Sequence, residues 1–150
     1  MDIIAAYPGY DFIDSGYFGF DASEDIIHYS SDELSSNEGR LSLLHEISHA
    51  LLGHFNFLND FELLIMETQA WHLTKKLCLK FGVGINDAYI EACIATYDHW
   101  LSSRSCCPQC GNFCLPTKQS SVFRCFLCNC AWEASANPHE AVRLTVLSYS

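Results

Sequence analysis

The sequence predicts an α+β fold in two parts: a short β-hairpin with three helices, followed by a small cysteine-rich β unit. Three observations support this class. Apolar residues recur at helical spacing between residues 36 and 101. Two short aromatic and β-branched stretches precede them. Past Ser102 the helical spacing ends and cysteines cluster, so we predict a boundary near residue 103, with units 1–103 and 104–150.

The hairpin is predicted from two stretches separated by turn-forming residues. Tyr17–Phe20 and Ile26–Tyr29 are rich in strand formers, and residues 21–25 between them are polar or small. We therefore expect two antiparallel strands joined by this loop.

The first helix is expected from about residue 36 to residue 52. Ser35 and Glu38 have the spacing of a capping box at its start, and Gly53 stands where a helix commonly stops. Its apolar residues cover most of the helix circumference, which predicts a buried helix.

Two further helices follow the same logic. Asn59 begins one that should end at Phe81, before Gly82, and another should run from after Asn86 to about Leu101. Lysines near the end of the second helix suit the negative end of its dipole.

Composition limits the function. Of 150 residues, 49% are hydrophobic, which is enough for a core, and the net charge of −10 argues against a surface that binds nucleic acid or anionic lipid throughout. Residues 1–103 carry a net charge of −12 and residues 104–150 a net charge of +2. No apolar run is long enough for a membrane span, and the N-terminus lacks the features of a secretory signal. We expect a cytoplasmic chain whose nine cysteines are reduced or bind metal.

One motif predicts a catalytic metal site. His45 and His49 lie four residues apart on the buried helix, so both imidazoles can reach one zinc ion. Glu46 lies beside them and can act as general base without taking a coordination position. The alternative is a chance match in which two core histidines are satisfied by hydrogen bonds.

A catalytic zinc usually has a third protein ligand, and Glu67 is the best candidate. On the second helix its neighbours one turn away are apolar, and a buried carboxylate needs a partner. That partner could instead be a lysine or the backbone. Glu62 is the rival ligand, although its place in the first turn suits a cap. His54 follows the predicted helix stop, and we interpret it as a pocket or structural residue.

The cysteine-rich part predicts a second, structural zinc site. Cys107 and Cys110 form one C-x-x-C pair, and Cys125 and Cys128 form another. Four thiolates close a tetrahedron and leave no open position, which predicts a zinc ribbon. The remaining cysteines of this part could substitute as ligands or be plain thiols: Cys106, Cys114 and Cys130.

Two segments together resemble a known family. Leu43–His54 is similar to the active-site helix of the ImmA/IrrE-type metallopeptidases, which are gluzincins, and Glu67–Trp71 resembles the segment that carries their glutamate ligand. The resemblance covers roughly residues 15–80. It implies a minimal zincin-like domain that hydrolyses peptide bonds in a protein substrate, with a role in regulated proteolysis of a repressor-like partner. In two places the sequence departs from the family pattern: Gln69 and Trp71 stand where acids and an asparagine are common.

Two alternatives remain open at this point. An SprT-like protease also joins this motif to a zinc ribbon and acts on DNA-bound proteins, but it uses a third histidine, for which His72 is the candidate. A non-catalytic zinc-binding module is the other, with the ribbon docking a protein or, on weak charge grounds, nucleic acid. Candidates to stabilise the oxyanion are His54, Tyr97 and His99.

Overall fold

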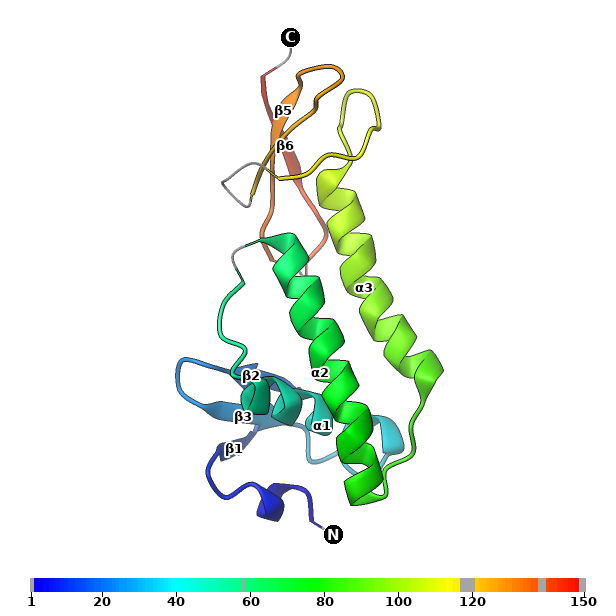
Figure 1. Cartoon of the computed structure of the whole chain (residues 1–150). Helices are drawn as coiled ribbons and strands as arrows, with labels where there is room; N and C mark the ends of the chain where they lie inside the picture. Colours follow the sequence, from blue (N-terminus) through cyan, green and yellow to red (C-terminus); the bar gives the residue numbers. More distant parts are fainter. Residues whose placement is uncertain (1, 58, 117–120, 138–139, 149–150) are drawn as a thin grey trace. The chain divides into compact units, whose positions relative to one another are not determined.

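The computed structural model describes residues 2–57, 59–116, 121–137 and 140–148. Its elements confirm the α+β class (Figure 1). In chain order they are η1 (Ile4–Ala6), β1 (Asp11–Asp14), β2 (Gly19–Asp21), β3 (Ile26–Tyr29), α1 (Asn37–Leu52), α2 (Asp60–Phe81), α3 (Asp87–Ser105), β4 (Val122–Arg124), β5 (Ala131–Ala134) and β6 (Leu144–Ser148). None of the described helices has the length and apolarity that crossing a membrane requires.

The chain forms two compact units. The first contains Met1–Asn56 and Ile65–Glu91, and the second contains Phe57–Leu64 and Ala92–Ser150. Helix α3 is divided between the two units after Glu91, and the boundary near residue 103 stays a prediction.

A three-stranded sheet in the order β1-β3-β2 belongs to the first unit. The predicted hairpin is confirmed: β2 and β3 pair antiparallel, with Gly19 opposite His28 and Phe20 opposite Ile27. Its turn is held by Asp21, whose Oδ1 accepts hydrogen bonds from the amide and the hydroxyl of Ser23 at 2.9 and 2.6 Å. The parallel strand β1 was not predicted from the sequence.

Helix α1 packs against β2 and β3, and Ile27 of β3 is fully buried. The cap of α1 is Ser36 rather than the predicted Ser35: the Ser36 side chain accepts a hydrogen bond from the Gly39 amide at 2.9 Å. Position 39 requires glycine, because a Cβ there would lie 2.1 Å from the carbonyl oxygen of Glu33. Glu38 takes no part in a capping box, and its carboxylate instead accepts from the Asn86 side chain at 3.1 Å.

Helices α2 and α3 begin at the predicted caps. The side-chain oxygen of Asn59 accepts from the Glu62 amide, and that of Asn86 accepts from the Tyr89 amide. Within the first unit, α1 and α2 meet through a hydrogen bond of 3.0 Å between the buried hydroxyls of Ser48 and Thr74. This pair places one turn of α2 directly against the helix that carries the histidine motif.

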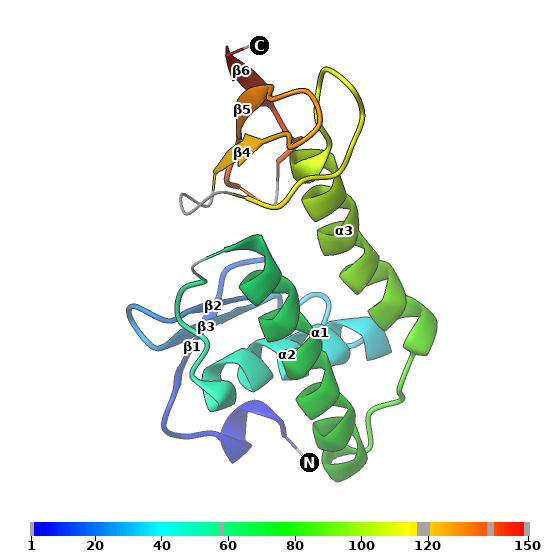
Figure 2. The ribbon, with the colours of Figure 1, turned by 45° about the horizontal axis from the view of Figure 1, so that its top comes forward.

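The second unit is built around a second small sheet, with strand order β4-β5-β6 (Figure 2). Phe123 and Trp132 are completely buried and stack with ring centroids 5.5 Å apart. Buried cysteines surround them, so the core of this unit and its cysteine cluster are continuous. The second unit also buries a charged side chain, Arg104, which forms an ion pair with Asp60.

Candidate metal centres

The two histidines of α1 point their ring nitrogens at one another. Because residues four apart share a helix face, the Nε2 atoms of His45 and His49 lie 3.1 Å apart. His45 is buried, and His49 is partly buried. Two imidazole nitrogens this close need a shared proton or a shared cation between them.

Glu67 of α2 completes the cluster. Its Oε2 lies 3.1 Å from His45 Nε2, and its Oε1 lies 3.5 Å from His49 Nε2. Zinc bonds of about 2.0–2.1 Å give a tetrahedral edge of about 3.3 Å, and the three observed separations fall around that value. Two imidazoles and one carboxylate with these separations fit a zinc ion that keeps an open position.

Electrostatics of the cluster favour an ionised carboxylate. Burial would raise the pKa of Glu67, but hydrogen bonds and charge from His45 and His49 outweigh it and lower the pKa to about 2. Glu67 is 5% exposed, so this is a buried anion held by two cation-capable rings. Such a partner-dependent buried charge is typical of a metal ligand.

Glu46 lies outside the ligand set and next to the edge strand. The backbone amide of Phe20 on β2 donates a hydrogen bond to its carboxylate. Burial raises the pKa of Glu46, while His45 and His49 oppose this effect. A carboxylate whose pKa is raised is a better proton acceptor than an exposed glutamate.

The two histidines are held in different ways. The His45 ring stacks on Trp71 with centroids 4.0 Å apart, and its Nδ1 has no hydrogen-bond partner among the described residues. His49 instead faces another ring: its Nδ1 lies 2.9 Å from Nδ1 of His54. The Nε2 of His54 lies 3.3 Å from Oε1 of Gln69. Burial, followed by the charge of His49, lowers the pKa of His54.

The other candidates from the sequence lie elsewhere. Glu62 occupies the first turn of α2, where its amide is capped by Asn59. His72 is exposed on α2. Tyr97 and His99 belong to the second compact unit, whereas the cluster belongs to the first. Among the residues that the structure describes, the donor set around His45 and His49 is thus completed by a carboxylate and not by a third histidine.

The four cysteines of the two C-x-x-C pairs form a second cluster. Cys107 and Cys128 have sulfurs 3.6 Å apart, and Cys110 and Cys125 have sulfurs 3.5 Å apart. All four sulfurs lie within 4.8 Å of one another. Zn–S bonds of about 2.3 Å give a tetrahedral edge of about 3.8 Å, so this cluster fits a metal ion with small adjustments.

The two C-x-x-C pairs of this cluster have the same backbone hydrogen-bond pattern. The amide of Cys107 donates to the carbonyl of Asn112, and the amide of Cys125 donates to the carbonyl of Cys130, at 2.9 and 2.8 Å. The residue after each pair has a positive φ: 72° at Gly111 and 57° at Asn129. Glycine and asparagine both tolerate this left-handed conformation.

Backbone amides also tune the thiols. The amides of Cys128 and Leu127 donate to Cys125 and lower its pKa to about 6, although burial opposes this effect. The pKa of Cys128 rises to about 12, because burial and the neighbouring thiols outweigh an amide of Cys130. The remaining cysteines are not in the cluster, and burial raises the pKa of both Cys114 and Cys130.

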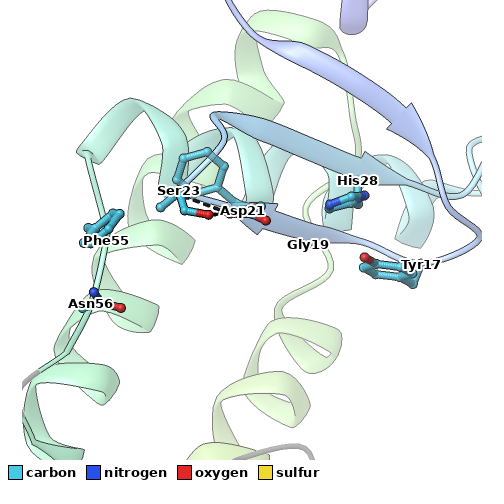
Figure 3. Close-up of a pocket in the computed structure, with 9 residues that line it drawn as sticks. Tyr17, Gly19, Asp21, Ser23, His28, Phe55 and Asn56 are labelled. Atoms are coloured by element: carbon cyan, nitrogen blue, oxygen red, sulfur yellow. Dashed lines mark hydrogen bonds between the residues drawn. The ribbon is translucent and has the colours of Figure 1, made fainter.

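A pocket of about 510 Å³ opens beside β2 (Figure 3). It is lined by residues of the hairpin, among them Tyr17, Asp21 and His28, and by Phe55 and Asn56, which follow α1. The rings of Tyr17 and His28 stack with centroids 5.1 Å apart. The pocket thus follows the strand whose Phe20 amide meets Glu46.

No protein-family model, curated protein or solved structure matches this chain. The geometry of the two clusters therefore carries the functional argument.

Proposed function

We propose that this chain is a zinc-dependent metallopeptidase with a zincin-like catalytic unit and a structural zinc ribbon. The observation that carries the proposal is the convergence of His45, His49 and Glu67 beside Glu46. A carboxylate as third donor supports the gluzincin type, and an exposed His72 gives no support to the SprT-like alternative.

The residues divide the chemistry between holding and proton transfer. His45, His49 and Glu67 would hold zinc. Zinc bound there would polarise the scissile carbonyl and lower the pKa of a water molecule. Glu46 accepts the proton from the attacking water and then donates it to the leaving amine. A hydrogen bond from the Phe20 amide would help to orient the Glu46 carboxylate during these transfers.

The edge strand supports a peptide as substrate. β2 is an edge of its sheet, and an extended peptide can add to such an edge through main-chain hydrogen bonds. A peptide aligned with β2 would pass Glu46 and place a side chain in the pocket that Tyr17, His28 and Phe55 line (Figure 3). A role in regulated proteolysis of a repressor-like partner is part of this proposal on family resemblance alone.

The cysteine cluster has a separate role. Four thiolates leave no open coordination position, so zinc held there cannot activate water. Its sulfurs are continuous with the buried core of the second unit, which supports a structural role. We assign zinc to this site as well, with two ions per chain.

A single substitution tests the proposal. Glu46→Gln should abolish cleavage of a peptide library and leave both zinc ions bound, because Glu46 moves protons and does not ligate. Glu38→Gln is the matched control, since it makes the same chemical change on the same helix at an exposed position. His49→Ala should lose one zinc ion together with activity. Cleavage that survives in Glu46→Gln would refute the assigned chemistry.

A further inference from the structure

His54 lies just beyond the end of α1, and the turn that ends this helix places its side chain next to the histidine cluster. Gly53 has a left-handed φ of 65°, and its amide bonds to the carbonyls of Ala50 and His49. The amide of His54 then donates to the His49 carbonyl at 3.1 Å. This turn reverses the chain immediately after the helix, so the His54 side chain lies against the ring of His49.

The contacts of the ring nitrogens determine which nitrogen of His49 and of His54 carries the proton. His49 directs its Nε2 at Glu67 and His45, so a ligating His49 has its lone pair on Nε2 and its proton on Nδ1. That Nδ1–H then donates to Nδ1 of His54 over 2.9 Å. His54 must therefore be protonated at Nε2, which donates to Oε1 of Gln69 over 3.3 Å. Each contact is satisfied by one assignment of tautomers.

This arrangement leaves His54 no nitrogen for a metal. Its Nδ1 faces His49 and its Nε2 faces Gln69, so it is neither a fourth ligand nor a group aimed at a substrate carbonyl. The two histidines of the cluster are therefore held differently: a hydrogen bond at Nδ1 holds His49, whereas stacking on Trp71 holds His45.

We propose that His54 is a positioning residue that fixes the tautomer and ring orientation of His49, with Gln69 fixing His54 in turn. This inference rests on the proposed function, since it assumes that His49 ligates through Nε2. Partners of this kind behind a metal-ligating histidine typically change metal affinity by about 10- to 100-fold.

Two substitutions separate the hydrogen bond from the shape of the ring. His54→Phe keeps an aromatic ring without an acceptor and should weaken the first zinc site by about 10- to 100-fold. His54→Asn places an oxygen near the position of Nδ1 and should restore affinity to within about threefold of the wild type. His72→Phe is the matched control, an exposed histidine of the same unit, and should leave affinity unchanged.

The measurement uses the full chain with its cysteine site loaded. Zinc affinity of the first site is read by competition with a chromophoric chelator, and His49→Ala identifies which binding step belongs to that site. In the wild-type protein with zinc bound, ¹⁵N NMR should show a coupling between the Nδ1 atoms of His49 and His54 across their hydrogen bond. This second readout does not depend on any variant folding.

The outcomes are distinct. Loss of affinity in His54→Phe, recovery in His54→Asn and an observed coupling support the positioning role. Equal affinity in His54→Phe and wild type, with the site lost in His49→Ala, overturns this inference and leaves the peptidase proposal intact. If His49→Ala keeps both zinc ions, the ligand set itself is wrong, and both proposals fall.

Discussion

Replacing Arg104 by methionine should destabilise the second unit by about 3–5 kcal/mol, because it leaves the Asp60 carboxylate buried without its cation. The two groups are 1% and 7% exposed. Their contact is two-pronged, with Nε to Oδ2 at 2.8 Å and Nη2 to Oδ1 at 3.1 Å. An exposed pair would contribute only about 0–1 kcal/mol, and the burial decides between these two ranges.

Other contacts push the loss in the same direction. Nη1 of Arg104 donates to the carbonyls of Ala134 and Ser135, and the guanidinium lies 4.4 Å from the ring centroid of Trp100. Methionine fills part of the volume but replaces none of these hydrogen bonds. For a domain of this size, each kcal/mol corresponds to about 4–8 °C in Tm, so the transition of the second unit should fall by at least about 12 °C.

Differential scanning calorimetry of the full chain, with zinc in excess, measures this shift. The double variant Asp60→Asn with Arg104→Met is the companion, since removing both charges should recover most of the loss. A loss below about 1 kcal/mol in Arg104→Met would refute the reasoning and place the pair in the surface class.

Three further outcomes follow. A chain cut after residue 103 loses most of the second unit, including the ion-pair partner of Asp60, so its remaining helices should unfold at lower temperature than in the full chain, as read by circular dichroism. In metal-free protein the pKa of Glu67 is lowered from 4.5 to about 2, so its contribution to the free energy of unfolding is complete above pH 4.5 and is lost as the pH falls towards 2. Denaturant titrations between pH 4.5 and pH 2 should therefore show that wild type loses up to about 3 kcal/mol more of its free energy of unfolding than Glu67→Gln does. Calorimetric zinc titration of the cysteine site at pH 7 should release about two to three protons if the empty site is folded, because Cys110 and Cys128 are protonated while Cys125 is mostly thiolate; nearly four would mean that the empty site is unfolded.

Much of the histidine and glutamate site could be predicted, because the positions of its two histidines depend only on spacing within one helix. The four-residue spacing of His45 and His49 places both rings on one helix face whatever the rest of the fold does. Glu67 was found from a different signal, a carboxylate with apolar neighbours one turn away. Long-range packing then brought the two helices together, and the buried pair of Ser48 and Thr74 shows where.

The features that were missed depend on tertiary contacts or on single torsions. The cap of α1 lies at Ser36, whose extended backbone lets its hydroxyl accept from the Gly39 amide. The strand β1 is short and mostly exposed, and its parallel pairing to β3 comes from a contact distant in sequence. The sequence suggests only a pocket or structural role for His54, because Gly53 ends the helix before it, whereas the structure shows that the turn at Gly53 brings its ring to His49.

The tetrathiolate site has a consequence for what the ribbon can attract. Residues 104–150 carry a net charge of +2 while the thiols are protonated. A zinc ion brings two positive charges and is held by four thiolates, of which Cys125 is already mostly ionised at pH 7 in the empty site. The loaded ribbon is therefore electrically neutral, and its weak attraction for a polyanion is lost on metallation. A filled ribbon would select partners by shape and apolar contact, such as through the exposed Phe126 and Leu127 beside the second pair of ligands.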